Sequence, residues 1–352
     1  MKTTFISTVT LWNSPRAALD KLQDNLAKAN TELTTGRHAD VGLALGYKVG
    51  EALSLRQQRA EIETLTDSNG LVIQRLKTTT AALDSIRDDA TKFRDALVGL
   101  PLNPPVEIIK GEAKAYMESL ISNLNSSVGG QFVFGGINTK VKPADDYAGG
   151  GPPSLKDLVA GAFSAPTGAG GFGFPQNDAL VSGIAAGDME AFLDGPFKQI
   201  FEGPGWGALS NASDQNIQSL ISPLEKVETS TNANTLPMRQ IAMAYTMIFD
   251  LGVESLSTAT RNVVLNKAIG ILSTAISGII GVQADVGTAH AKTERATERM
   301  DLQKSIFEER IGQLEAVDPT EAKVRVDQLM TQIQTSYSLT AQLKQLSLIN
   351  YL

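Results

Sequence analysis

One short glycine-rich segment of this sequence matches a pattern that performs chemistry in other proteins. Residues 168–173 read GAGGFG and fit the G-x-G-x-x-G arrangement that binds the pyrophosphate of a dinucleotide. That arrangement works only where a buried strand turns into a helix, because the helix amides then face the phosphates. Here Pro166 precedes the segment and Pro175 follows it, so neither flank fits. We interpret the segment as a loop. A nucleotide-binding protein that uses the Gly168 loop is the least favoured of the functions considered.

Residues suited to metal binding or nucleophilic catalysis are scarce. The chain has no cysteine, which excludes disulfides, zinc–thiolate sites and thiol nucleophiles. Its two histidines, His38 and His290, are far apart in the sequence, and we interpret both as surface or seam-edge residues. The paired acids at residues 88–89 and 145–146 fit solvated surfaces. The sequence therefore predicts no catalytic residue, no metal site and no cofactor, and we do not expect an enzyme.

Composition and charge narrow the range of partners. The length of 352 residues allows about two or three domains. The residues are 42% hydrophobic, and the net charge is −7. An acidic chain is not expected to bind nucleic acid or an anionic membrane through bulk charge. Residues 1–9 lack the continuous apolar stretch of a cleaved signal peptide. Residues 268–282 are apolar but short and contain serine and threonine, so they make a poor membrane span. We expect any export to proceed without a cleaved signal.

Two long segments with a seven-residue repeat dominate the sequence. A narrow apolar seam held over such a distance is typical of helices that pack along their length in a bundle or coiled coil. The early seam contains Leu55, Ile62, Asn69, Leu76, Leu83, Ala90 and Leu97, with Leu65, Val72, Thr79, Ile86, Phe93 and Leu100 beside them; the late seam contains Leu265, Leu272, Ile279, Val286, Thr293, Met300, Phe307 and Leu314.

The polar seam residues Asn69 and Thr79 have two interpretations. Each position could be a point where the seam frays and is exposed to solvent. Each could instead control register, since a polar group at a seam position penalises wrong helix pairings. The sequence alone does not decide between the two, because no partner helix can be assigned to either residue.

Turn and capping residues place the helices of the N-terminal part. Ser14 fits the N-cap of a first helix, with proline at the first helical position, and Gly36 fits its end. Glycines are expected to keep residues 37–50 irregular. A long helix then covers about residues 51–99, and a third helix covers residues 106–124.

The C-terminal helix has a clear start signal. Asp318 fits an N-cap and Pro319 the first helical position, while Glu321 has the spacing of a capping-box residue that reaches back to the N-cap. These residues predict a break after the late seam, followed by a new helix that continues towards residue 352.

Residues 129–235 differ in amino-acid composition from the rest of the chain. They contain 18 of the 31 glycines and no arginine, which predicts a turn-rich domain of mixed β and short helical structure. Residues 131–136 fit a brief strand that leads into a turn. Residues 214–226 and 238–249 return to a helical pattern. The most economical interpretation is an insert between the two long seams.

The predicted fold class is therefore mainly α. The N- and C-terminal segments form a long antiparallel helical bundle or coiled coil, and a glycine-rich mixed β/α domain is inserted between them. Three domains are expected: terminal helices at 1–45 and 318–352, heptad helices at 46–140 and 236–317, and the insert at 141–235.

The two terminal helices each carry one apolar stripe that nothing nearby in the sequence covers. They could pair with each other, but two isolated helices bury little surface and would be marginal. Copies of the same pair on neighbouring molecules would bury the rest, in a ring or helical assembly. The predicted assembly interface consists of Leu19, Leu22, Leu26, Leu33, Leu329, Ile333, Leu339, Leu343, Leu346 and Leu352.

Four segments resemble the bacterial flagellin superfamily. They are LTTGR at 33–37, GGQFVFGGINT at 129–139, VQADVG at 282–287 and QLSLINYL at 345–352. The second and fourth are more similar to the hook–filament junction branch of that superfamily than to filament flagellin. Residues 42–50 depart from the family pattern, because they are glycine-rich where a polar, Asp-containing run is expected.

The resemblance implies a structural subunit exported unfolded by the flagellar type III apparatus. Such a subunit would join the hook to the filament and contact another hook-associated protein, flagellin and copies of itself. An export chaperone would hold the C-terminal helix. The terminal helices would line the axial core and the heptad helices the next shell, with the insert facing outward. A filament flagellin is the alternative that the resemblance leaves open.

Overall fold

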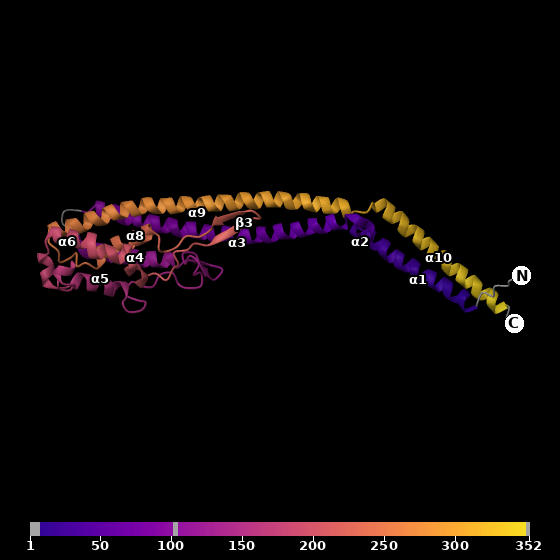
Figure 1. The fold of residues 1–352 in the computed structure, drawn as a ribbon, viewed down its shortest axis with the longest axis horizontal. Coiled ribbons are helices and arrows are strands. Elements are labelled where there is room, and N and C mark those ends of the chain that lie inside the picture. The colour runs from indigo at the N-terminus through magenta and orange to yellow at the C-terminus, as the bar shows by residue number, and fades with distance from the viewer. Residues whose placement is uncertain (1–7, 101–104, 350–352) are drawn as a thin grey trace. The chain divides into compact units, whose positions relative to one another are not determined.

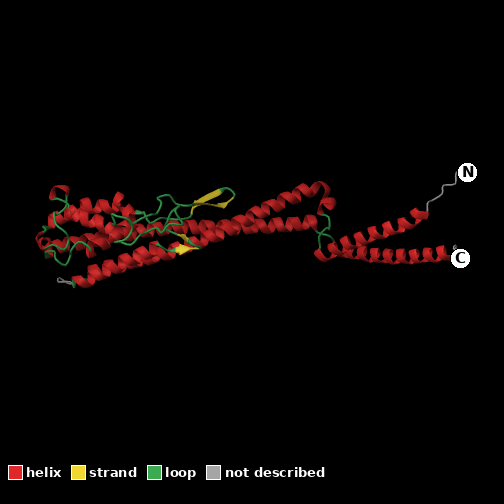
Figure 2. Ribbon diagram, turned by 90° about the horizontal axis from the view of Figure 1, so that it is seen from below, coloured by secondary structure: helices red, strands yellow, loops and turns green. Residues whose placement is uncertain are grey.

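The structure, a computed structural model, describes residues 8–100 and 105–349. Most of its ordered elements are helices, as the sequence predicts (Figures 1 and 2). The helices are α1 (Thr8–Thr35), α2 (Val41–Leu45), η1 (Gly46–Lys48), α3 (Val49–Val98), α4 (Val106–Leu124), α5 (Leu155–Ser164), η2 (Thr167–Ala169), η3 (Ala179–Gly183), α6 (Ala186–Phe192), η4 (Leu193–Phe197), α7 (Lys198–Glu202), η5 (Pro204–Ala208), α8 (Leu236–Phe249), α9 (Thr258–Glu315) and α10 (Pro319–Ile349).

Four short strands form two separate antiparallel pairs. β1 (Ser127–Val128) pairs with β2 (Gln131–Phe132), which confirms the brief strand predicted at residue 131. β3 (Gln218–Ser222) pairs with β4 (Glu225–Glu228), and Figure 2 shows both pairs in yellow. The described chain is therefore mainly α, with one strand pair just before the predicted insert and one inside it.

The chain divides into two compact units. We call Met1–Thr64 together with Met300–Leu352 the terminal unit, and Leu65–Arg299 the central unit. Helices α3 and α9 each contribute residues to both units. The three-part division expected from the sequence stays a prediction.

The heptad seams form the core that the sequence predicts. In the central unit, Leu76, Leu83 and Ala90 of α3 are fully buried, and so are Leu272 and Ile279 of α9. The two helices run antiparallel in this unit, since Gln283 Nε2 donates to Asp84 Oδ1 at 2.8 Å while Asn69 Nδ2 donates to Thr297 Oγ1 at 3.1 Å. Side chains at every seventh position therefore share one face of each helix and pack inward.

Helices α4 and α8 complete the core of the central unit. They pack against each other, and an aromatic group joins them to α3. Phe93 of α3 lies 5.3 Å from Tyr116 of α4 and 5.4 Å from Tyr245 of α8, measured between ring centroids. Tyr245 is among the largest fully buried side chains, so this aromatic group contributes much of the buried apolar surface between the three helices.

Asn69 and Thr79 are both fully buried, so the fraying interpretation is wrong for each. Asn69 Nδ2 donates to the backbone carbonyl of Ile221 in β3 at 2.8 Å, in addition to Thr297. Thr79 donates only to Arg75 O of its own helix, at 2.9 Å. Register control is thus available to Asn69, which bonds to two other segments, whereas the Thr79 hydroxyl is satisfied locally.

An Asn69→Ala variant should lower the free energy of unfolding of the central unit by about 1–3 kcal/mol, because the buried backbone carbonyl of Ile221 loses its hydrogen-bond donor. Thr79→Val is the matched control, since it removes only an intrahelical bond, and it should cost about 1 kcal/mol or less. Urea unfolding followed by circular dichroism measures both. Equal stability of the two variants would show that the Ile221 contact adds nothing to the fold.

Several boundaries differ from the sequence-based predictions. Helix α1 already includes Thr8, ahead of the expected Ser14 N-cap, and residues 41–48 are helical where an irregular segment was expected. Residues 214–226 form most of the β3–β4 hairpin instead of a helix. Pro223 is incompatible with a helix interior, and the burial of β3 alternates along the strand, so a period of two prevails there.

Among the described residues, one helix, α9, is long and apolar enough over one stretch to cross a membrane by length and composition alone. The core helices of soluble proteins also meet this criterion of length and composition. Here Ala268, Leu272 and Ala275 of that stretch lie in the core of the central unit. Ser273 and Ser277 on its exposed face donate to carbonyls of their own helix.

Candidate assembly interface

The terminal unit pairs α1 with α10 along one apolar seam, and both views show these helices side by side (Figures 1 and 2). Their directions are opposite, since Gln23 contacts Tyr337 while Glu32 contacts Arg325. The seam is lined by Leu19, Leu22, Leu26, Ala29 and Leu33 from α1 and by Ala322, Val326, Leu329 and Ile333 from α10. Alanine and valine positions are buried, but the leucines remain partly exposed. A two-helix seam leaves apolar surface that a further neighbour could cover.

The structure brings together six of the predicted interface residues and separates a seventh. Leu339 lies off the seam with 55% of its surface exposed, beside the similarly exposed Tyr337. Ser336 and Thr340 occupy the seam-side positions there instead. The side chains of Leu343 and Leu346, and the whole of Leu352, lie outside the described residues. Contact of all these residues with neighbouring copies stays a prediction.

The segments that leave α1 and enter α10 are joined by a short backbone ladder. The His38 amide donates to Glu315 O at 3.1 Å, and the Val317 amide donates to Gly36 O at 3.0 Å. Gly36 has a φ of +68°, a conformation that strongly favours glycine, and it ends α1 as predicted. The glycine turn therefore brings the chain after α1 alongside the chain before α10.

A buried carboxylate reinforces this ladder. The Glu315 side chain is completely buried and contacts two guanidinium groups, those of Arg37 and Arg56, the latter at 2.6 Å. Burial alone raises the pKa of this carboxyl, but the hydrogen bonds and positive charge of the two arginines outweigh it, so its pKa lies below the ordinary value of 4.5. Glu315 is thus ionised at neutral pH and holds residues from three segments of the terminal unit.

Acid should loosen this junction. Because the native pKa of Glu315 is lowered, its stabilising effect is complete above the ordinary value and is lost as pH falls through the native value. Asp318, whose pKa is lowered by backbone amides of the α10 N-terminus, acts in the same direction. We expect the protection factors of α10 amides, which are corrected for the intrinsic exchange rate at each pH, to fall below about pH 4.5 and to fall less in Glu315→Gln. An unchanged acid response in that variant would contradict a role for Glu315, and Glu321→Gln is the exposed control.

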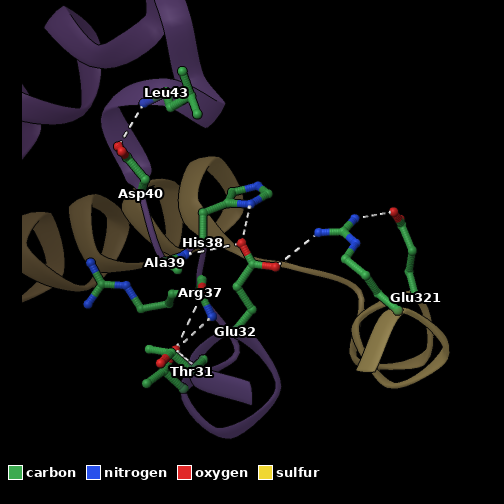
Figure 3. Close-up of polar contacts among 10 residues, drawn as sticks. Thr31, Glu32, Arg37, His38, Ala39, Asp40, Leu43 and Glu321 are labelled. Carbon is green, nitrogen blue, oxygen red and sulfur yellow. Dashed lines mark hydrogen bonds and ion pairs between the residues drawn. The ribbon is translucent and has the colours of Figure 1, made fainter. Parts of the chain in front are cut away.

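Glu32 forms a second link, which Figure 3 shows in close-up. Its Oε1 accepts the Ala39 amide at 3.2 Å, and its Oε2 pairs with Arg325 Nη1 of α10 at 3.0 Å. Arg325 also contacts Glu321 at 2.7 Å, so Glu321 does not reach back to the N-cap as the capping-box spacing predicts. Asp318 does cap α10, since it accepts the Thr320 amide at 2.7 Å.

Ion pairs flank the α3–α9 seam in the terminal unit. Glu63 lies 3.1 Å from Lys304, and Glu51 lies 3.2 Å from Arg310. The order of these pairs along the two helices shows that α3 and α9 are antiparallel in this unit too. Exposed pairs of this kind contribute about 0–1 kcal/mol each, so they favour orientation more than stability.

The Gly168 loop does not offer its amides to a ligand. The Phe172 amide donates to Phe163 O at 2.8 Å, and the Gly173 amide donates to Ala165 O at 2.9 Å. A side chain at Gly171 would meet Ala165 O at 2.4 Å, so this glycine serves close backbone packing. The loop brings the Phe172 ring within 4.7 Å of the Phe163 ring and closes an aromatic cluster.

Acids and histidines do not gather into a metal site in the described parts of the chain, where no group of three or more suitable residues occurs. His38 Nδ1 lies 3.8 Å from Glu32 Oε1, and His290 Nδ1 lies 3.4 Å from Glu294 Oε2 on its own helix. His38 therefore lies at the edge of the junction, where Glu32 already has two stronger partners.

Reasoning from the sequence missed the charged residues of the junction. The burial of Glu315 could have been predicted from its spacing. It follows the buried Ile311 by four residues, so it lies on the same face of the helix, where an acid is unexpected. Glu32, Arg56 and Arg325 carry no such signal, because charged residues at these positions look like an ordinary solvated face. Only the pairing of distant segments identifies them.

Comparisons with known proteins agree with this geometry. A family model of the bacterial flagellin N-terminal helical region matches residues 6–139, and a model of the flagellin C-terminal helical region matches residues 269–352. No curated protein matches the chain. A solved structure provisionally described as a flagellar hook-associated protein from Vibrio parahaemolyticus is similar, with a TM-score of 0.50 and 12% identity over 76% of this chain and 97% of that one.

The two matched regions include all of α1, α3 and α10 and most of α9, and so they contain the paired ends, the early heptad seam and the late seam from Leu272 onward. At 12% identity the solved structure supports the fold alone. The chain belongs to the bacterial flagellin superfamily and is a structural protein of the flagellum.

Proposed function

We propose that this protein is the adaptor that joins the flagellar hook to the filament, the role of hook-associated protein three. The observation that carries the proposal is the terminal unit, whose helices α1 and α10 pair along a leucine seam and are joined by the Glu32–Arg325 ion pair, yet leave that seam partly exposed. Such a surface suits a subunit that is completed by neighbours along an axis. The segments at 129–139 and 345–352 favour the junction branch over filament flagellin.

The adaptor role implies a set of partners, which are part of the proposal. Copies of this chain would contact each other through the terminal unit, with another hook-associated protein and flagellin as the axial neighbours. An export chaperone would bind the C-terminal helix before assembly, since the exposed apolar residues Met330, Tyr337 and Leu339 of α10 would otherwise self-associate early. Export would proceed through the type III apparatus, and the site of action would be the extracellular hook–filament junction.

Filament flagellin is the second candidate, because both matched family regions are those of flagellin. Immunogold labelling of intact flagella separates the two functions. An antibody against the central unit should mark one short zone at the distal end of the hook if the chain is the adaptor. Label along whole filaments would overturn the adaptor role and favour flagellin. Calorimetric titration with NAD or ATP addresses the nucleotide-binding alternative, for which the hydrogen-bonded Gly168 loop predicts no binding.

A further inference from the structure

The turn of the β3–β4 hairpin presents a leucine where hairpins usually carry polar residues or glycine. The two-residue turn is Pro223-Leu224, and Leu224 is 99% exposed. Turns of this length favour Asn-Gly and similar pairs, because the strand twist requires positive φ angles. No non-glycine residue in the described chain has a positive φ, and the hairpin accommodates its turn with an irregularity between Leu220 and Ser222. Local structure therefore gives no reason for leucine at this position.

The hairpin is held firmly beneath its turn. Ile221 is fully buried, and its carbonyl accepts the Asn69 side-chain amide at 2.8 Å. Ser219 and Thr229 hydroxyls lie 2.6 Å apart across the two strands, and Arg299 of α9 lies 3.4 Å from Glu225. Leu224 thus projects from an anchored base, which lowers the entropy cost of inserting it into a partner.

A pocket of about 490 Å³ opens at the other end of the same hairpin, between β4, the segment that follows it and α9. Its floor is apolar and buried, formed by Leu76, Val286 and Ala289. Lys226 and Lys292 line it from opposite elements. This volume falls within the range of about 300–1,000 Å³ that is typical of binding pockets.

Some polar groups that line the pocket are free to contact a protein ligand, and others already have partners within the chain. The Thr235 hydroxyl is buried in the wall and makes no hydrogen bond among the described residues. Glu228 and Asp285 also line the pocket, but the Glu228 carboxylate is occupied by the Asn216 amide at 2.5 Å. Leu224 of the same chain is not part of the pocket lining, so its own turn does not fill it.

We propose that Leu224 of one copy inserts into this pocket on the next copy, so that the hairpin turn and the pocket form a repeating contact between central units. The turn offers an apolar side chain followed by the Glu225 carboxylate. The pocket offers buried apolar residues for the leucine, and its two lysines, beside Glu228 and Asp285, can pair with the Glu225 carboxylate. Because the two surfaces differ, the contact is head-to-tail and can repeat without closing on a pair. The inference rests on the proposed function and adds a specific contact to it.

Cross-linking tests this contact directly, because the natural chain has no cysteine. Leu224→Cys protein is mixed with Thr288→Cys or with Lys292→Cys protein, whose replaced residues line the pocket on successive turns of α9, and the mixture is oxidised under assembly conditions. We expect a disulfide heterodimer in at least one mixture, since a disulfide needs Cα atoms within about 7 Å. Leu180→Cys, from an exposed leucine elsewhere in the central unit, replaces Leu224→Cys in the matched control.

The outcomes separate this inference from the proposed function. Assembly of the natural chain, seen by light scattering, without cross-linking above the Leu180→Cys control would overturn the contact and leave the adaptor role standing. Cross-linking of Leu224→Cys to itself alone would show that the turns meet each other, and would also overturn it. Failure of the natural chain to self-associate at all would reject both. Leu224→Ser should raise the concentration needed for half-assembly by roughly tenfold, because a leucine is lost from the interface, whereas Leu180→Ser should not.

Discussion

Replacement of both arginines that contact Glu315, in an Arg37→Met/Arg56→Met variant, should lower the free energy of unfolding of the terminal unit by about 3 kcal/mol. The carboxylate is completely buried, so without either guanidinium it becomes an uncompensated charge in the protein interior. Loss of the partners of a buried ion costs about 3–5 kcal/mol, and the lower end applies here because the arginines are 51% and 43% exposed. Hydrogen exchange of α1 and α10 amides measures the effect.

Two controls isolate the buried charge as the cause. Arg310→Met breaks an exposed pair with Glu51 and should cost about 1 kcal/mol or less. Adding Glu315→Met to the double variant should restore most of the lost stability, since an apolar replacement of all partners is often neutral. A double variant as stable as the natural protein would show that water or the backbone, and not the arginines, satisfies Glu315.

Deletion of residues 340–352 should abolish self-assembly while the central unit stays folded. The deletion shortens α10 and removes Leu343, Leu346 and Leu352 of the predicted assembly interface, but it leaves every residue of Leu65–Arg299 in place. Circular dichroism should retain most of the helical signal, and light scattering should detect no polymer. The physical reason is that a subunit surface completed only by neighbours contributes to assembly more than to the fold of one chain.

The matched control for the deletion is Val98→Ser, which changes an exposed apolar residue of the central unit and should leave assembly unchanged. In cells, the truncated protein should fail to attach filaments. Filament attachment by the truncated chain would contradict the role assigned to the C-terminal stripe, whatever the behaviour of the purified protein.

Helices with strong local signals were predictable from the sequence. The seven-residue repeat identified Leu76, Leu83 and Ile279 as seam residues because a helix places them on one face whatever its partner. Asp318 and Gly36 marked a helix start and a helix end for equally local reasons, since a cap and a left-handed turn depend on neighbouring residues only.

Predictions from local sequence patterns were wrong where contacts between distant residues determine the secondary structure. Residues 214–226 form a hairpin because Ile221 packs into the core and accepts a hydrogen bond from Asn69, 152 positions away along the chain. The helical pattern read from the sequence could not include that contact. Asn69 shows the same limit, since its position in the seam was predictable and its two partners were not.

The sequence by itself determined that this protein consists of long helices with narrow seams, flanked by amphipathic ends. Those properties follow from periodicity and capping, which act over a few residues. The tertiary structure alone decided that Arg37 and Arg56 neutralise Glu315, that Glu32 joins the turn after α1 to α10, and that a pocket opens between α9 and the hairpin whose turn carries Leu224. Ion pairs and pockets join residues distant in the chain, and their stability depends on the burial that folding creates.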